Sequence, residues 1–241
     1  MRLDVYLVEN DLVVSRTEAK KFITEGAVTI DGKIITKPAF EVNVFSKIDI
    51  DKSSKKYVSR GGLKLEAALL AFGISPEGKK AIDIGASSGG FTDCLLKFGA
   101  KHVIAVDSGT DQLSSTLRSD ERVSSIENFN ARYMGPSDFE YLADIAVMDV
   151  SFISATYLIK PLYDCLTQNA DFVCLIKPQF EVGKAHVGKG GIVKDEKARE
   201  NAKKTVIDFA ENIGFKCLGS ITSPIIGGDG NIEFLAHFRK N

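Results

Sequence analysis

From Lys79 to the C-terminus, short apolar runs alternate with longer segments in which apolar residues recur every three or four positions. The runs that predict strands are 81–84, 102–107, 123–126, 144–149 and 172–176, and the segments that predict helices are 91–98, 153–166 and 196–212. Strands and helices that alternate in this way form a mainly parallel sheet covered on both faces. Two last strands, 216–222 and 232–238, are joined by a loop too short for a helical crossover, so they form an antiparallel hairpin. The pattern predicts an α/β fold with a doubly wound sheet that ends in this hairpin.

The first 51 residues follow a different pattern. Ser15 and Glu18 have the spacing of a capping box and predict a helix that ends near Gly26. Strands at 27–30 and 33–36 flank Asp31-Gly32, a dipeptide that favours a tight hairpin turn, and a further strand covers 46–50. We therefore expect a small α+β domain at 1–51, a basic interdomain linker at 52–62, and the larger domain at 63–241.

Composition limits the classes of protein to which the chain belongs. A hydrophobic content of 44% over 241 residues supports a packed core, and the net charge of -1 leaves only local contacts for a polyanion. Cys94, Cys165, Cys174 and Cys217 are widely spaced in apolar runs, which indicates reduced thiols and a cytoplasmic location. The three histidines are scattered, so we expect no metal site. No apolar run reaches the ~20 residues of a membrane span, and we expect no membrane partner.

A glycine-rich turn, Asp83 to Phe91, lies between the first strand and the first helix of the larger domain. Gly85, Gly89 and Gly90 remove side chains that would keep a cofactor from the backbone, and the helix that follows presents its N-terminal amides. The turn lacks the G-x-G-x-x-G spacing of dinucleotide sites, and Asp83 suits a cationic ammonium or a hydroxyl better than a phosphate. S-adenosylmethionine is therefore the predicted cofactor. An ordinary strand-to-helix turn is the alternative reading.

Three further polar residues end predicted strands, at the sheet edge where ligands bind in such folds. Asp107 ends the second strand, where its carboxylate can accept hydrogen bonds from both ribose hydroxyls of a cofactor. Asp149 ends the fourth strand and Lys177 the fifth. Each residue alone could cap a helix or face solvent, but their matched positions favour a common site.

Several motifs, in order along the chain, resemble those of the TlyA family. They are Tyr57 to Leu65 (YVSRGGLKL), the glycine turn, Met148 to Phe152 (MDVSF), Leu175 to Glu181 (LIKPQFE) and Gly230 to Phe234 (GNIEF). The resemblance runs nearly end to end. It implies a Rossmann-like, FtsJ-like methyltransferase domain that uses S-adenosylmethionine to methylate a ribose 2′-hydroxyl of ribosomal RNA, with a cytidine of the large subunit as the expected target and the small subunit as a possible second one.

The resemblance also assigns residues. The family's Lys-Asp-Lys-Glu tetrad falls on Lys64, Asp149, Lys177 and Glu233. Lys177 is the candidate to accept or relay the hydroxyl proton; alternatively, both lysines stay charged and stabilise the developing alkoxide while the acids orient them. The residues expected to contact the cofactor are Asp83, Gly85, Gly89, Phe91, Asp107, Asn130 and Asp149. Asn130 would lie near adenine, where FtsJ-like relatives commonly have an acid, and Phe91 stands where they have tryptophan.

The first fifth of the chain resembles the RNA-binding domain first known from ribosomal protein S4, through Arg2-Leu3-Asp4, Ser15-Arg16 and Gly26-Ala27-Val28. A generic α+β cap with solvated charges is the alternative. The resemblance implies phosphate contacts with structured RNA. Together with the linker and a later glycine-rich loop, it gives these candidate RNA-binding residues: Arg2, Arg16, Lys20, Lys21, Lys55, Lys56, Arg60, Lys184 and Lys189.

The segment 183–190 nearly matches a phosphate-binding P-loop, but Gly190 stands where the Ser or Thr that holds Mg²⁺ belongs, and no helix opens directly after it. A loop over the RNA or a plain connector is the better interpretation. The sequence thus favours a ribosomal RNA 2′-O-methyltransferase over two hypotheses of other classes. One is a membrane-active hemolysin, and the other is an RNA-binding assembly factor without catalytic activity.

Overall fold

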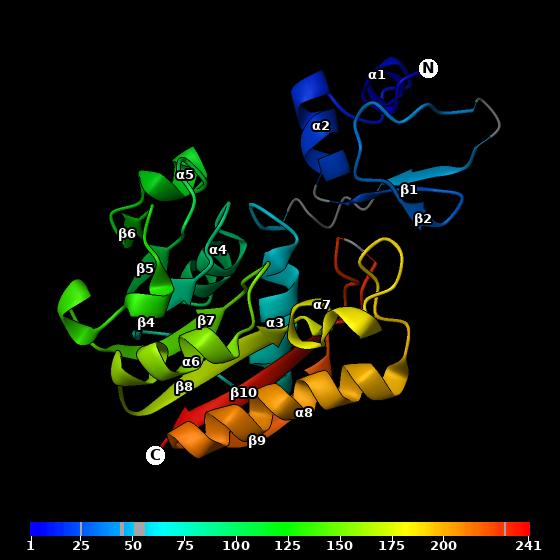
Figure 1. Cartoon of the computed structure of the whole chain (residues 1–241). Coiled ribbons are helices and arrows are strands. Elements are labelled where there is room, and N and C mark those ends of the chain that lie inside the picture. Colours follow the sequence, from blue (N-terminus) through cyan, green and yellow to red (C-terminus); the bar gives the residue numbers. More distant parts are fainter. Residues whose placement is uncertain (25, 44–45, 51–55, 229) are drawn as a thin grey trace. The chain divides into compact units, whose positions relative to one another are not determined.

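A computed structural model gives the fold (Figure 1) and describes residues 1–24, 26–43, 46–50, 56–228 and 230–241. The chain divides into two compact units, Met1–Arg60 and Gly61–Asn241. This division falls inside the predicted linker 52–62, whose first residues lie outside the described ones and whose last two belong to a helix.

The smaller unit packs two helices against a three-stranded antiparallel sheet. The helices are α1 (Leu3–Glu9) and α2 (Arg16–Thr24), and the sheet has the order β2 (Lys33–Ile34), β1 (Val28–Ile30), β3 (Ile48–Ile50). Ser15 caps α2 as predicted, because its Oγ accepts a hydrogen bond from the Glu18 amide at 3.1 Å. Asp31 and Gly32 both have positive φ, 50° and 77°, which confirms the predicted tight turn.

The larger unit is built on a seven-stranded sheet of order β6-β5-β4-β7-β8-β10-β9. The parallel strands are β4 (Lys80–Ile84), β5 (His102–Val106), β6 (Val123–Ile126), β7 (Ala143–Met148) and β8 (Leu166–Ile176). The last two strands, β9 (Phe215–Thr222) and β10 (Phe234–Lys240), form the predicted antiparallel hairpin, and β10 also pairs antiparallel with β8. The order reverses between β4 and β7, which makes their carboxyl ends the expected ligand edge.

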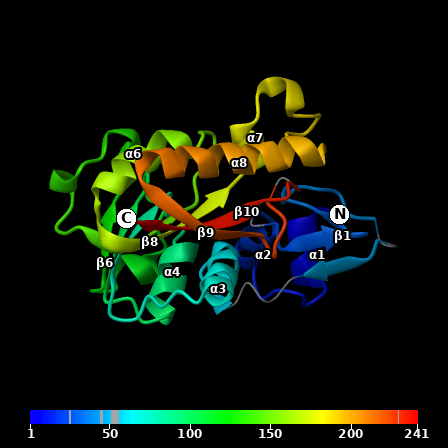
Figure 2. The same ribbon diagram turned by 90° about the horizontal axis from the view of Figure 1, so that it is seen from below.

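Helices cover both faces of this sheet. Figure 2 shows α6 (Thr156–Asp164) and α8 (Glu196–Ile213) along one face, and α3 (Gly61–Phe72) and α4 (Gly90–Lys97) along the other. Two short helices, α5 (Ser115–Arg118) and α7 (Pro178–Glu181), follow strands β5 and β8 at the ligand edge. The central strands are almost continuously buried, as expected for a sheet covered on both sides. The predicted α/β fold is confirmed.

Several elements differ from the prediction: helices α1, α5 and α7 were not predicted, and two larger differences lie in the larger unit. Helix α3 was not predicted, because its glycine-rich start was interpreted as part of the linker. The helix predicted at 153–166 is shorter, since α6 ends at Asp164 and β8 begins at Leu166. Leu166 is buried and pairs with Ala143, and Asn169 turns the strand with φ 61°. The first residues of β8 are largely polar, so the sequence pattern does not predict this part of the strand. Its pairing with β7 shows it.

Candidate active site

The glycine-rich turn runs from the end of β4 to the start of α4. The amides of Gly85 and Ala86 both donate to the Val106 carbonyl, which ties the turn to β5. Gly85 has φ 82°, and a Cβ added there would lie 2.4 Å from the Asp149 carbonyl oxygen. Gly89 has φ 95°, and its Cβ would lie 2.2 Å from a methyl carbon of Leu117. The protein's own packing therefore requires both glycines, a reason that the sequence analysis did not foresee.

A cavity of about 370 Å³ opens beside this turn, between the ends of β4, β5 and β7. Its volume falls within the range of small-molecule sites, roughly 300–1,000 Å³. Four of the predicted cofactor residues line it: Gly85, Asp107, Asn130 and Asp149. Asn130 also begins the short helix Ala131–Tyr133, and its side chain accepts the Arg132 amide. The cavity thus brings together residues from four separate segments at the predicted edge.

Asp107 accepts a backbone hydrogen bond on each of its carboxylate oxygens. Its Oδ2 accepts the Ser87 amide at 2.8 Å, and its Oδ1 accepts the Gly109 amide at 2.7 Å. A carboxylate offers about four acceptor positions, so each oxygen keeps one for a further donor. The side chain is half-buried and lines the cavity. These remaining acceptor positions fit the two ribose hydroxyls of S-adenosylmethionine.

Asp83 and Phe91 support the turn from beneath. Asp83 is fully buried, and its Oδ2 accepts a hydrogen bond from Thr92 Oγ1 at 2.7 Å, while its Oδ1 has no partner among the described residues. Burial, reinforced by the charges of Asp149 and Asp107, raises the pKa of Asp83 to about 7. Phe91 is buried as well. Asp83, Phe91 and Gly89 do not line the cavity, so their direct contact with a cofactor stays a prediction.

The four tetrad residues form two ion pairs. Lys177 Nζ lies 2.5 Å from Asp149 Oδ1 and donates to Ser151 Oγ at 2.8 Å. Lys64 Nζ, from α3, donates to Glu233 Oε2 at 2.5 Å. The second pair is the more buried, with side-chain exposures of 11% for Lys64 and 3% for Glu233. Sequence reasoning named all four residues, and the structure supplies their pairing.

Strand register places the two pairs next to each other. Phe234 of β10 pairs antiparallel with Ile176 of β8, and Glu233 and Lys177 directly flank this last pair at the same end of the sheet. Asp149 directly follows Met148, the last residue of β7, which lies beside β8. Both pairs therefore lie at the ligand edge, and Asp149 connects them to the cavity.

Phe152 is a functional candidate that the sequence analysis missed. It lines the cavity, its side chain is 91% exposed, and its ring lies 5.3 Å from that of Phe180, centroid to centroid. Its φ of 64° is an unfavourable conformation for a bulky residue and costs about 1–3 kcal/mol. Such strain, in an exposed apolar residue at a cavity mouth, is typical of a ligand contact. Only its place directly after Asp149-Val150-Ser151 could have signalled it.

The predicted RNA-binding residues are brought together only in part. Arg2 and Arg16 converge on the buried Asp4, with N–O distances of 2.9 Å each, and both guanidinium groups stay about half-exposed. The hydrogen bonds from Arg2 and Arg16 hold the pKa of Asp4 well below its usual range. Lys20, Lys56 and Lys189 are exposed, and Arg60 is half-buried beside Gly26. Lys55 lies outside the described residues, and the side chains of Lys21 and Lys184 are not described.

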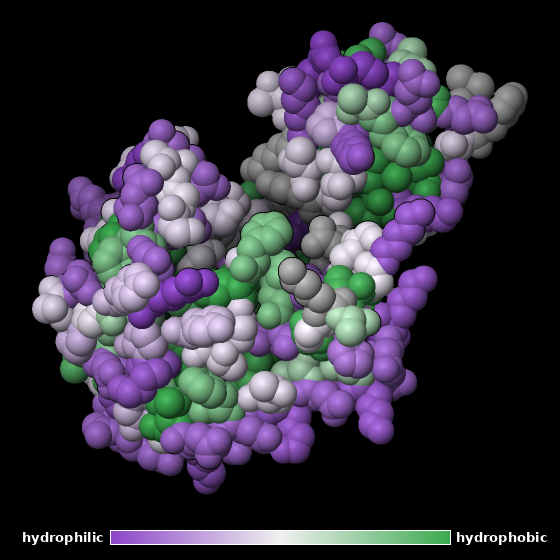
Figure 3. Space-filling model, viewed as in Figure 1, coloured by the Kyte–Doolittle hydropathy of each residue, from purple (hydrophilic) through white to green (hydrophobic). Residues whose placement is uncertain are grey.

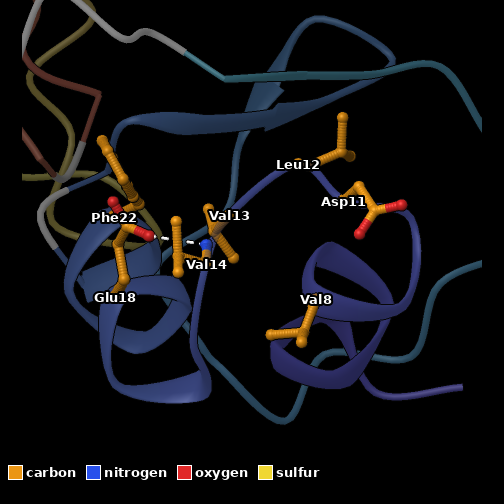
Figure 4. A pocket seen from close by; sticks show the side chains of 7 residues that line it. All are labelled: Val8, Asp11, Leu12, Val13, Val14, Glu18 and Phe22. Carbon is orange, nitrogen blue, oxygen red and sulfur yellow. Dashed lines mark hydrogen bonds between the residues drawn. The ribbon is translucent and has the colours of Figure 1, made fainter.

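The smaller unit also has a cavity of about 390 Å³, shown in Figure 4. Asp11 and Glu18 lie among its apolar lining residues, and Glu18 accepts the Val14 amide at 2.7 Å. Its described lining includes no cationic side chain, so this cavity is a poor phosphate site. Arg2 and Arg16 are therefore the better candidates for RNA contact in this unit.

Two kinds of feature are absent from the described part of the chain. There, no three His, Cys, Asp or Glu side chains are grouped to hold a metal ion. Within the same residues, no helix has the length and apolar character needed to cross a membrane.

The fold and the site define a methyltransferase that uses S-adenosylmethionine. The FtsJ-like methyltransferase family matches residues 57–240, and the S4 domain matches residues 1–48. The chain belongs to the TlyA family, in which these two parts are joined.

Known relatives show this membership directly. The chain is 41% identical to the 16S/23S rRNA (cytidine-2′-O)-methyltransferase TlyA of Mycobacterium tuberculosis, over 99% of this chain and 89% of that protein. It is 34% identical to the 23S rRNA (cytidine-2′-O)-methyltransferase TlyA of Campylobacter jejuni, over the full length of both. A solved structure from Streptococcus thermophilus, named as a hemolysin, is 44% identical with a TM-score of 0.80 and covers 100% of this chain and 88% of that one.

Proposed function

We propose that this protein transfers the methyl group of S-adenosylmethionine to the 2′-hydroxyl of a cytidine in ribosomal RNA. Residues 1–51 would bind the RNA, and residues 63–241 would carry out the transfer. The observation that carries the proposal is the Lys177–Asp149 ion pair, which borders the cavity, with Lys64–Glu233 at the same end of the sheet. The functions named for the relatives agree with it.

The residues of the cavity fit the cofactor. Asp107 would accept hydrogen bonds from the ribose, and Asn130 would lie near the adenine of the cofactor. Gly85 lets the turn pass close to Asp149. Bound S-adenosylmethionine supplies an electrophilic methyl group on a sulfonium. The chain's own task is then to hold the acceptor hydroxyl in line with that methyl and to handle its proton.

Lys177 and Asp149 are placed for this task. A ribose hydroxyl at the cavity edge would meet Lys177 Nζ and the Asp149 carboxylate, which are 2.5 Å apart. Either Lys177 accepts or relays the proton, or it stays charged and stabilises the alkoxide. Lys177→Arg separates the two roles, because arginine keeps the charge and does not give up its proton. Retained turnover would assign alkoxide stabilisation, and lost turnover would assign proton transfer.

Phe152 would hold the target nucleotide in place. An exposed ring beside the cavity gives the base of an unstacked target nucleotide a stacking surface. The half-exposed guanidinium groups of Arg2 and Arg16, together with Lys189, would contact phosphates elsewhere on the RNA. The ribosome as substrate implies a cytoplasmic location.

The names of these two relatives differ in the target RNA: one gives 16S and 23S rRNA, and the other gives 23S rRNA. We propose the large-subunit RNA as the target here. To test the function, purified protein is incubated with methyl-labelled cofactor and with each ribosomal subunit, or with each naked RNA. Wild type should label large subunits, and Lys177→Ala should not; equal background labelling by the two would contradict the proposal.

Two control measurements address the competing hypotheses. A membrane-active hemolysin would release dye from liposomes without cofactor, whether or not Asp149 is replaced by alanine. On the face that Figure 3 shows, hydrophilic residues are interspersed with hydrophobic ones, which gives no reason to favour that activity. An inactive assembly factor would bind subunits without turnover.

A further inference from the structure

One wall of the cofactor cavity is the loop between β5 and α5. Ser108 and Gln112 of this loop line the cavity, and both are exposed, as are Thr110 and Asp111. Asp111 has φ 52°, a conformation that non-glycine residues adopt at a cost. Burial of side chains therefore does not fix the shape of this stretch of the wall. Hydrogen bonds to its backbone must do so.

The carboxylate of Glu127 supplies these bonds. Its Oε2 accepts the Asp111 amide at 2.7 Å, and its Oε1 accepts the amides of Gln112 at 3.0 Å and Leu113 at 3.1 Å. Arg118 Nη2 donates to the same Oε1 at 3.0 Å and, through Nη1, holds Asp111 at 2.8 Å. Three successive backbone donors of the wall thus converge on one side chain, which follows directly after β6.

The same carboxylate orders the glycine turn indirectly. Leu113 is buried, and one of its methyl carbons would lie 2.8 Å from a Cβ on Gly89. At the start of the loop, Asp107 holds the Gly109 amide. The loop is therefore fixed by one carboxylate at each end. Asp107 lines the cavity, whereas Glu127 does not.

We propose that Glu127 is a positioning residue for S-adenosylmethionine, which holds residues 108–113 in the shape that binds the cofactor. Without it the loop would sample other conformations, and binding would have to select the competent one. The apparent dissociation constant then rises by the inverse of the competent fraction. The amides of Leu113, Asp111 and Gln112, with Arg118, outweigh burial and lower the pKa of Glu127, so the acceptor is ionised at neutral pH. The inference rests on the cofactor and not on which RNA is methylated.

Calorimetric titration of S-adenosylmethionine into Glu127→Gln tests the proposal without RNA. A glutamine has one acceptor oxygen, and its NH₂ group cannot accept an amide hydrogen. We expect the dissociation constant to rise about tenfold, as it does when the competent fraction falls to about a tenth. Asp120→Asn is the matched control, because Asp120 accepts the Arg122 amide and guanidinium in the same way, but Arg122 is not part of the cavity wall. That variant should bind within about twofold of wild type.

Equal affinity of Glu127→Gln and wild type, or an equal loss in Asp120→Asn, would overturn the proposal. Glu127→Asp, which keeps the charge but shortens the reach, gives a second test if the glutamine variant does not fold, and should weaken binding to a smaller extent. In turnover assays, KM for the cofactor should rise while kcat at saturating cofactor and KM for RNA stay unchanged. A purely structural defect would instead lower kcat or the melting temperature at unchanged cofactor KM. Absence of any RNA methylation by wild type would contradict the proposed function and leave the binding result standing.

Discussion

The strand pair β8–β10 carries an ionic cluster near each end, and the two clusters differ in access. Towards the C-terminal end of β10, Asp171 faces Arg239 in register and accepts hydrogen bonds from Lys79 at 2.9 Å, His237 at 2.9 Å and Arg239 at 2.6 Å. Where β10 begins, Glu233 and Lys177 directly flank the last pair of the register, Phe234 with Ile176. Each cluster combines carboxylate and cationic side chains, some of them on or directly beside β8 and β10.

The two clusters differ in how many acceptor positions of the central carboxylate already bind donors of the protein itself. Both oxygens of Asp171 are taken by the protein's own donors, and its side chain is only 6% exposed. Asp149, the partner of Lys177, is 22% exposed and lines the cofactor cavity. A closed cluster serves stability, whereas an open one at a cavity can meet a substrate. The two clusters should therefore respond in opposite ways to the same substitution.

The largest effect is expected from Lys177→Met. Loss of the lysine at the open cluster should lower kcat for RNA methylation by about 10²–10⁴-fold, the usual contribution of a positioned acid, base or charge. The melting temperature should change little. Lys79→Met is the matched control at the closed cluster, and it should keep its kcat and lose stability. If both variants lost activity equally, exposure to the cavity would not explain the difference between the two clusters.

Asp171→Asn should break the closed cluster. Removing one partner of a buried ionic group costs about 3–5 kcal/mol. Burial alone would raise the pKa of Asp171, but hydrogen bonds from His237, Arg239 and Lys79 outweigh it and hold the pKa well below the usual range. Wild type should therefore lose stability as pH falls below about 4, where the unfolded carboxyl takes up a proton first.

Urea unfolding at several pH values checks this prediction. The difference between wild type and Asp171→Asn should be greatest at neutral pH and should shrink on acidification. Methylation at a temperature where both variants are folded should stay within about twofold. A constant difference at all pH values would show that the charge of Asp171 does not stabilise the fold.

Asp83 adds a third case to the comparison, because it is a buried carboxyl that has no cationic partner among the described residues. Its pKa is raised to about 7, so the folded state keeps a proton that the unfolded chain releases near pH 4. Stability should therefore fall as pH rises from about 4 to 7, by at most about 1.4 kcal/mol per pH unit from this group. Asp83→Asn should remove this dependence, as measured by the same unfolding series. An unchanged slope would contradict the assignment.

The smallest effect concerns Phe152. Phe152→Ala should weaken RNA binding by about 1–3 kcal/mol, the usual contribution of one stacked base. Cofactor affinity should be unchanged, and the loss of an exposed, strained ring should not lower the melting temperature. Phe152→Tyr keeps the aromatic face and should bind RNA like wild type. Equal RNA affinity of the alanine and tyrosine variants would exclude stacking.

Much of this arrangement could be predicted because strands and their carboxyl ends follow directly from apolar periodicity. Asp107, Asp149 and Lys177 end three such runs, which already places them at one edge. Helix α3 was missed, since Gly61-Gly62 is typical of a linker, and so was the polar start of β8. The pairing of Lys64 with Glu233 depends on contacts across 169 residues, which periodicity does not specify.

For the glycines of the turn, the sequence predicted the positions but not the physical reason for them. Their positions predicted a cofactor turn, but the reason for Gly85 and Gly89 is contact with Asp149 and Leu117, which only the folded packing reveals. Phe152 was missed because an isolated phenylalanine normally indicates core. Glu127 was missed because three of its partners are backbone amides, which leave no trace in the sequence.

Nucleoside mass spectrometry of large-subunit RNA, modified by the purified protein, tests the central claim most directly. After digestion, wild type with S-adenosylmethionine should yield 2′-O-methylcytidine, and Lys177→Met should yield none above background. A methyl group found on a base instead of a ribose, or the same yield from both proteins, would contradict the account.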